Sequence, residues 1–276
     1  MTAFDNISVG FIGGGIMAEA VIKGLLRQQL VPAERIIASD PLEARRAHLA
    51  GTLHIRTTAS NAEAVNAGQL LVLAVKPQVL RSVMAELGGS IPTDRLVLSI
   101  VAGAKLAAIR KHLGAQAIVR VMPNTPAQVG EGVSVWTATP EVNAIQREQA
   151  RAILAALGPE VYMEGEGYLD MAAAISGSGP AYVFLIIEAL IDAGVRMGCA
   201  RPVAEKLVLQ TVRGSAIYAQ QSGQHPAVLR NMVTSPGGTT AAALHVLEKG
   251  GLRALLSDAA QACYERSQYL GSLGEE

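Results

Sequence analysis

Short apolar runs rich in β-branched residues alternate with stretches of helical periodicity as far as residue 163. This alternation predicts strands joined by helices in a parallel sheet. The run Leu70–Val75 is apolar at every position, as expected for a strand covered on both faces. Strands are predicted at 8–12, 35–39, 70–75, 96–100 and 118–121, with weaker candidates at 54–57, 133–136 and 160–163.

The pattern changes near Gly165–Gly167, beyond which helical periodicity dominates. Ser178-Gly179-Pro180 predicts a helix start, with a hydroxyl as the cap and proline in the first turn. Residues 181–195 are apolar on nearly every side, so we expect them to be buried. A second helix is predicted from Pro202 to about residue 220, and a last helical segment is interrupted near Gly250.

Helices this apolar leave more surface than a small helical domain can cover, and large exposed apolar patches usually mark interfaces. We therefore expect a homodimer formed through the helical part. The alternative is a compact monomeric bundle.

Composition limits the classes of partner. Lys plus Arg equals Asp plus Glu, at 23 each, so no basic excess favours nucleic acid or an anionic membrane. The apolar run 181–187 ends at Glu188, short of the ~20 residues that a membrane span needs. The N-terminus lacks the pattern of a signal peptide, and we expect a soluble, cytoplasmic protein. The two cysteines and five histidines lack paired spacing, so no metal site is expected and the cysteines should be buried.

The segment Val9–Ala18 predicts a strand, a glycine turn and a helix. Gly13, Gly15 and Ala18 fit the dinucleotide fingerprint, in which the glycines form the turn and admit a pyrophosphate. The expected fold class is therefore α/β, with a Rossmann-like NAD(P)-binding domain at 1–163. An all-α dimerisation and substrate domain is expected at 164–276.

The choice between NAD and NADP stays open. Asp40 ends the second predicted strand and could hold a ribose 2′-hydroxyl, which favours NAD. Ser39, Arg45 and Arg46 could instead accept a 2′-phosphate, although the arginines also fit a solvated helix face. Asn61 could cap the following helix or touch the adenosine, and a cap is the simpler interpretation. Other strand ends should line the same crevice, at 74–77, 100–103 and 122–126.

A second ligand site is predicted at Thr234–Thr240, where a proline and two glycines precede an alanine-rich helix. A helix N-terminus leaves amides unpaired and carries a partial positive charge. Hydroxyls crowd the same junction. The combination indicates a pocket for a small carboxylate, and two such sites in one chain indicate an enzyme with a cofactor and an anionic substrate.

Five motifs together resemble the pyrroline-5-carboxylate reductase family over nearly the full length. The stretches that carry the resemblance are Phe11–Ala18, Ala74–Pro77, Met122–Pro126, Ser176–Tyr182 and Val233–Thr240. The resemblance implies NAD(P)H-dependent reduction of 1-pyrroline-5-carboxylate to L-proline by hydride transfer to the C=N carbon. It also implies dimers that commonly assemble into rings of five, with an active site shared between subunits.

The resemblance also implies roles for individual residues. Those expected at the nucleotide are Ile12, Gly13, Gly14, Gly15, Ile16, Met17, Asp40, Asn61, Ala74, Val75, Lys76, Pro77, Ile100, Val101, Ala102 and Asn124. Those expected at the substrate are Ser235, Gly237, Gly238, Thr239 and Thr240. Thr240 is the expected catalytic residue, bonding the ring nitrogen, and its alternative role is a helix cap. The chain departs from the family pattern near Gly223–Pro226 and at Asn231, where acidic residues are frequent.

Two other functions compete with this interpretation. A β-hydroxyacid dehydrogenase shares the domain order but needs a catalytic lysine, and after residue 150 only Lys206 and Lys249 are available. A non-catalytic nucleotide sensor would keep the glycine loop without needing a second anion pocket.

Overall fold

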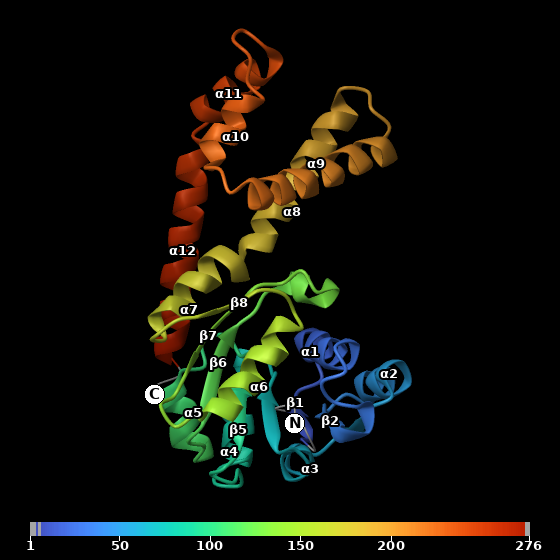
Figure 1. Cartoon of the computed structure of the whole chain (residues 1–276), viewed down its shortest axis with the longest axis vertical. Coiled ribbons are helices and arrows are strands. Elements are labelled where there is room, and N and C mark those ends of the chain that lie inside the picture. Colours follow the sequence, from blue (N-terminus) through green and yellow to red (C-terminus); the bar gives the residue numbers. More distant parts are fainter. Residues whose placement is uncertain (1–3, 5–6, 274–276) are drawn as a thin grey trace. The chain divides into compact units, whose positions relative to one another are not determined.

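The computed structural model describes residues 4 and 7–273 and divides the chain into two compact units (Figure 1). The sheet unit comprises the chain up to Ser178 together with the segment from Cys263 onward, and the helical unit is Gly179–Ala262. The packing boundary therefore lies beyond the predicted boundary at residue 163. Residues 164–178 belong with the sheet because Leu169 and Ala174 are buried there and the Glu166 carboxylate pairs with Arg120.

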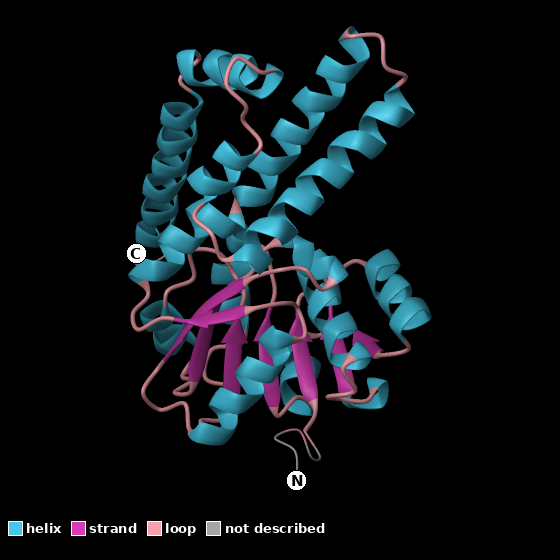
Figure 2. Cartoon of the chain, turned by 45° about the horizontal axis from the view of Figure 1, so that its top comes forward, coloured by secondary structure: helices cyan, strands magenta, loops and turns pink. Residues whose placement is uncertain are grey.

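One eight-stranded sheet forms the centre of the sheet unit (Figure 2). Its order is β3-β2-β1-β4-β5-β6-β7-β8. The strands are β1 Val9–Ile12, β2 Ile36–Ser39, β3 Arg56–Thr58, β4 Leu70–Leu73, β5 Leu96–Ser99, β6 Ile118–Met122, β7 Ser134–Ala138 and β8 Glu160–Tyr162. All eight predicted strands are present. The expectation of a parallel sheet fails at one place, since β7 runs antiparallel to β6. Only the short 3-10 turn η2 Thr125–Val129 lies between them, without the long crossover that a parallel pair requires.

Helices cover both faces of this sheet because successive strand residues point to opposite sides. Phe11, Val72 and Leu98 face one core, and their neighbours Ile12, Leu71 and Val97 face the other. The first face packs against α1 Ile16–Arg27, α2 Glu43–Leu53 and α6 Ala144–Ala155. The second packs against α3 Asn61–Ala67, α4 Pro77–Glu86 and α5 Leu106–Leu113. The short 3-10 turn η1 Ala33–Arg35 leads into β2.

Trp136 anchors the outer strands. Its side chain is 1% exposed, and its indole N–H donates to the Glu160 carboxylate on β8. The ring of Tyr162 meets it edge to face at 4.8 Å, and the Arg147 guanidinium of α6 lies 5.8 Å from the indole centroid. These contacts connect β7 and β8 to α6.

A continuous helix spans Gly167–Arg196, made of α7 Gly167–Ala172, the π-helical turn η3 Ala173–Gly177 and α8 Gly179–Arg196. The predicted helix start at Ser178 is therefore wrong. The alanine-rich residues before it are strong helix formers, and the Ser178 hydroxyl lies 3.1 Å from Cys263 Sγ instead of capping.

This helix is long and apolar enough to cross a membrane by length and composition, contrary to the expectation from the run 181–187. The expectation failed because the helix continues on both sides of that run. A single helix of this length and composition is weak evidence for a membrane span, because the core helix of a soluble protein can have both properties.

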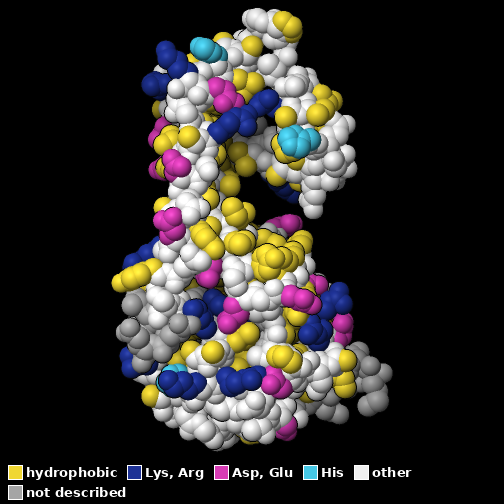
Figure 3. Space-filling view, turned by 90° about the vertical axis from the view of Figure 1, so that its left-hand side faces the viewer, with side chains coloured by type: hydrophobic (Ala, Val, Ile, Leu, Met, Phe, Trp, Pro, Cys, Tyr) yellow, Lys and Arg dark blue, Asp and Glu magenta, His cyan; other side chains and the backbone are white. Residues whose placement is uncertain are grey.

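The helical unit has almost no core of its own. It contains α8, α9 Arg201–Ser222, α10 Pro226–Met232, α11 Thr239–Lys249 and the first part of α12 Leu252–Leu273. Within residues 179–262, all of which the structure describes, only Ile191 and Ala204 are buried apolar side chains. Phe184 and Leu185 are 61% and 66% exposed, so residues 181–195 are not buried within one chain as predicted. Apolar side chains consequently reach the surface of this unit (Figure 3).

Gly10 tests the packing between β1 and α3. A Cβ atom at Gly10 would lie 2.3 Å from the Ala64 carbonyl oxygen. Gly10→Ala should therefore lower the free energy of unfolding by about 1–3 kcal/mol, measured by urea denaturation. Gly51→Ala is the matched control, because Gly51 is an exposed residue of α2 where an added Cβ would meet no atom within 4 Å. It should be neutral or stabilising by up to ~1 kcal/mol. Equal losses in both variants would contradict this account.

Candidate active site

The carboxyl ends of neighbouring parallel strands meet in one register. Ile12 of β1 is paired with Ser39 of β2 and with Leu73 of β4, and Leu73 is paired with Ser99 of β5. Backbone bonds continue one residue further: Gly13 N donates to Ser39 O at 3.0 Å, and Ala74 N donates to Ile12 O at 2.9 Å. The predicted nucleotide-binding loops thus begin side by side at this edge of the sheet.

The glycine loop after β1 has the geometry that the fingerprint requires. Gly13 adopts φ 98°, and a Cβ there would lie 2.8 Å from Ala74 O. A side chain at Gly15 would meet no atom within 4 Å, so its surface is open to a ligand. Gly15 is also the N-cap of α1 and provides no side-chain cap, and both Gly15 and Ile16 are exposed. The first amides of α1 can therefore donate hydrogen bonds to an anion such as a pyrophosphate.

Asp40 ties the loop after β2 to the glycine loop. Its Oδ2 accepts a hydrogen bond from Gly14 N at 3.1 Å, and its Oδ1 accepts one from Leu42 N at 2.9 Å. Arg46 Nη1 donates to the carbonyl oxygens of Asp40 and Pro41 at 2.8 and 3.0 Å. The Asp40 carboxylate thus joins the loops that follow β1 and β2.

Ser39 is not available to a 2′-phosphate. It is fully buried, and its hydroxyl lies 2.7 Å from Asn61 Oδ1 and 3.2 Å from Phe11 O. The interpretation of Asn61 as a helix cap is also wrong, because Ser60 caps α3 by accepting from Glu63 N. Asn61 instead donates to Glu86 Oε2 at 2.9 Å.

A charge cluster around Glu19 supports the glycine loop from α1. The Glu19 carboxylate contacts Lys23 at 2.6 Å, His48 at 3.3 Å and Arg45. Arg45 in turn donates to the carbonyl oxygens of Gly14 and Gly15. Burial alone would raise the pKa of Glu19, but the hydrogen bonds from Lys23, Arg45 and His48 outweigh it and lower this pKa to about 2. The cluster was not predicted, because nothing in the local sequence connects Glu19 with α2.

The remaining residues predicted to bind the nucleotide differ in how exposed they are. Lys76, Pro77 and Ala102 are exposed at the edge, whereas Val101 is buried and can offer only its backbone. The Asn124 side chain is occupied: Oδ1 accepts from Val133 N at 2.9 Å and Nδ2 donates to Ser176 O at 3.1 Å. Asn124 therefore links the loop after β6 to the π-helical turn, a role that its position in a Pro-Asn-Thr-Pro turn did not signal.

The loop before α11 has the predicted turn. Gly237 adopts φ 66°, and Gly238 N donates to Ser235 O at 3.0 Å. A Cβ at Gly238 would lie 2.3 Å from Ser235 Oγ, so a larger residue there would displace the Ser235 side chain. Helix α11 starts at Thr239, directly after the glycines, with Gly238 as a cap that has no side chain.

Unpaired donors gather at this helix start. The hydroxyls of Ser235, Thr239 and Thr240 have no hydrogen-bond partner within residues 4 and 7–273. Ser235 and Thr239 are exposed, and Thr240 is half-buried. Thr240 does not cap its own helix, which disfavours the alternative role of that residue.

One of the five histidines has a structural role as a helix cap. His225 caps α10 by accepting from Ala227 N at 3.2 Å. Cys199 and Cys263 are partly buried, less than expected. Among residues 4 and 7–273, no group of three or more His, Cys, Asp or Glu side chains is placed to hold a metal ion.

Comparison with known proteins identifies the family. A family model described as pyrroline-5-carboxylate reductase dimerisation matches residues 166–270, and one described as NADP oxidoreductase, coenzyme F420-dependent, matches residues 8–103. A pyrroline-5-carboxylate reductase of Synechocystis sp. is 46% identical and covers 96% of this chain and 99% of its own. The chain belongs to the pyrroline-5-carboxylate reductase family.

Other pyrroline-5-carboxylate reductases are similar to this chain over nearly its full length. The enzyme of Pseudomonas aeruginosa is 43% identical over 95% of this chain and 96% of its own. The solved structure from Coxiella burnetii has a TM-score of 0.86 at 37% identity, covering 96% of this chain and 99% of its own. The structure from Plasmodium falciparum, solved with NADP bound, has a TM-score of 0.89 at 33% identity, covering 97% and 99%. Family membership confirms an oxidoreductase and sets aside the β-hydroxyacid dehydrogenase alternative.

The Glu19 cluster generates a prediction about pH. Because folding lowers the pKa of Glu19, its carboxylate stabilises the fold fully above the ordinary pKa of 4.5 and loses this effect as pH falls towards 2. Glu19→Gln should therefore be less stable than the parent protein at neutral pH, with the difference narrowing as pH decreases below 4.5. Urea denaturation at a series of pH values measures the difference. Glu34→Gln, at an exposed position, should show no such dependence. A Glu19→Gln difference that stays constant with pH would contradict the assignment.

Proposed function

We propose that this protein reduces 1-pyrroline-5-carboxylate to L-proline with NAD(P)H, the last step of proline biosynthesis. The observation that carries the proposal is that α1 and α11, in a chain of this family, each have glycine as the cap residue, Gly15 and Gly238, and so no side-chain cap. The first follows a dinucleotide loop and the second is surrounded by unpaired hydroxyls. They suit a cofactor pyrophosphate and a substrate carboxylate respectively.

The cofactor edge comprises Ile12–Met17, Asp40, Asn61, Ala74–Pro77 and Ile100–Ala102, with Asn124 holding the neighbouring loop. When bound, a reduced nicotinamide supplies the hydride. The amides of Gly15 and the first turn of α1 bind the pyrophosphate. Asp40 presents a carboxylate to the ribose, and Arg45 and Arg46 are the cations nearest in sequence for a 2′-phosphate. Either NADH or NADPH is compatible with this arrangement.

The substrate loop orients the cyclic imine. Backbone amides of Thr239 and Thr240 bind the carboxylate together with the Ser235 hydroxyl, in charge-assisted hydrogen bonds, and Gly238 lets the carboxylate approach them because it has no side chain. Gly237 supplies the positive φ that turns the chain towards the ligand. The Thr240 hydroxyl bonds the ring nitrogen and steadies the developing amine.

The reaction needs little acid–base catalysis. A protonated C=N bond is already electrophilic. The hydride forms a new C–H bond with its own electron pair, and the π pair of the C=N bond moves to nitrogen as the lone pair of the neutral ring amine. The residues of this chain contribute mainly orientation and exclusion of water. The acidic residues frequent in relatives near Gly223 and Asn231 are not required for this transfer.

The assembly that we propose is a homodimer through the helical unit, with five dimers in a ring as the larger form, in the cytoplasm. The sparse core of residues 179–262 supports an apolar interface, and the dimerisation family model covers the same stretch. The nicotinamide facing the substrate loop would then come from the partner subunit.

An absorbance assay of NADH and NADPH oxidation with 1-pyrroline-5-carboxylate tests activity and cofactor choice together. Oxidation that depends on the imine, with proline as product, is the expected result. Cofactor binding without turnover of any cyclic imine would overturn the proposal in favour of a nucleotide sensor.

Thr240→Val tests the catalytic residue. The variant keeps the shape but removes the hydroxyl, so kcat/KM should fall roughly 10- to 150-fold, given ~1.5–3 kcal/mol for a hydrogen bond to a charged group. Steady-state kinetics measures the change. Thr52→Val makes the same chemical change at an exposed position of α2 and should leave kcat/KM unaltered. Unaltered kinetics in Thr240→Val would remove Thr240 from the mechanism.

Phe184→Glu tests the assembly. Phe184 is 61% exposed in one chain of 28.7 kDa, and we expect it to be covered by a partner. Sedimentation should show the parent protein as a dimer or larger and the variant shifted towards monomer, because a buried unpaired carboxylate is costly. A parent protein that is entirely monomeric at micromolar concentration would contradict the dimer.

A further inference from the structure

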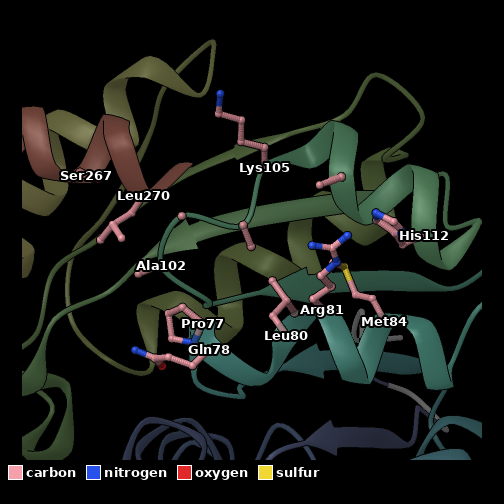
Figure 4. A pocket seen from close by; sticks show the side chains of 13 residues that line it. Pro77, Gln78, Leu80, Arg81, Met84, Ala102, Lys105, His112, Ser267 and Leu270 are labelled. Carbon is pink, nitrogen blue, oxygen red and sulfur yellow. The ribbon is translucent and has the colours of Figure 1, made fainter. Parts of the chain in front are cut away.

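We propose that a cavity between α4, α5 and the last turns of α12 binds a small organic anion with an apolar body. The cavity has a volume of about 330 Å³ and lies wholly within the sheet unit. Its walls come from three elements, with Leu80 and Met84 on α4, Ala108 on α5 and Leu270 on α12 (Figure 4). This volume falls at the lower end of the ~300–1,000 Å³ typical of small-molecule sites.

The basic side chains that line the cavity favour an anionic ligand. Arg81, Lys105 and His112 line it, and no lining residue is acidic. The Arg81 guanidinium has no ion-pair or hydrogen-bond partner within residues 4 and 7–273. By contrast, Arg110 on the same helix as His112 pairs with Glu141. An unpaired guanidinium beside an apolar wall suits a carboxylate, which it can bind through two parallel hydrogen bonds.

Arg81 and His112 lie at one end of the cavity. Figure 4 shows the Arg81 guanidinium near His112, with Met84 beside it. Leu270 and Pro77 lie towards the other end together with Gln78, and Lys105 extends away from both. A ligand with a carboxylate at one end and a hydrocarbon chain at the other matches this arrangement. Burial of the hydrocarbon against Leu80, Met84 and Leu270 would supply the apolar part of the affinity.

The cavity adjoins the expected cofactor edge. Pro77 at the start of α4 and Ala102 after β5 line the cavity and also belong to the predicted nucleotide-binding residues. An occupant would therefore change the cofactor affinity by bearing on loops that the cofactor also contacts. This coupling rests on the proposed function, whereas binding to the cavity does not.

Hexanoate is a suitable probe, with hexanamide as the uncharged counterpart. Ligand-observed NMR on the full chain should show saturable hexanoate binding at millimolar concentration and much weaker binding of hexanamide. Arg81→Gln should weaken hexanoate binding roughly tenfold or more. Ala108→Leu should remove binding by filling the cavity while keeping a good helix former. Arg56→Gln, an exposed position on β3, is the matched control and should bind hexanoate normally.

The outcomes separate the two claims. Absence of hexanoate binding, equal binding of hexanamide, or unaltered binding in Ala108→Leu would overturn the cavity proposal. An NADPH dissociation constant that hexanoate shifts in the parent protein, but not in Ala108→Leu, would establish the coupling, and an unshifted constant would refute it. A protein that binds hexanoate but no nicotinamide nucleotide would refute the proposed function and leave the cavity site intact.

Discussion

The shared register of β1, β2, β4 and β5 is the constraint on which the cofactor edge depends. Because these strands end at Ile12, Ser39, Leu73 and Ser99 in mutual register, their following loops must leave the sheet at one level. Gly13 then approaches Ala74 so closely that a side chain is excluded. The glycine fingerprint is thus as much a consequence of strand packing as of ligand binding.

The two ligand loops satisfy a common requirement in different ways. Each places a glycine at the cap of a helix, so that no side chain competes with a ligand for the free amides. The loop after β1 is stiffened by Asp40 and by Arg45, which the Glu19 carboxylate holds. The loop before α11 is held by its own turn and by the Thr234 hydroxyl, which donates to Arg230 O at 2.7 Å. The hydroxyls of Ser235, Thr239 and Thr240 have no partner among the residues that the structure describes. The loop after β1 is therefore held in place by side chains, whereas the loop before α11 offers hydroxyl groups that are free to turn towards a ligand.

Sequence patterns predicted the regular parts well because their causes are local. Each of the eight strands is a β-branched or apolar run, and the break near Gly250 follows from Gly251, which adopts φ 72°. Several of the failures involve contacts between distant segments. Ser39 was expected to contact a ligand and Asn61 to cap a helix, but their side chains contact each other. Ser178 was expected to cap a helix, but its hydroxyl contacts Cys263 Sγ. The apolar helix 181–195 was expected to be buried, but one chain holds too little structure to cover it.

Trp136 makes the two units optically distinct. It is the one tryptophan in the sequence, and its indole is enclosed by Tyr162, Arg147 and Glu160 at the outer strands of the sheet. Its fluorescence therefore reports the integrity of the sheet unit alone, whereas circular dichroism in the far ultraviolet includes the long helices of residues 179–262. Thermal unfolding curves from fluorescence and from circular dichroism would therefore coincide if the two units unfold together and differ if they unfold one after the other.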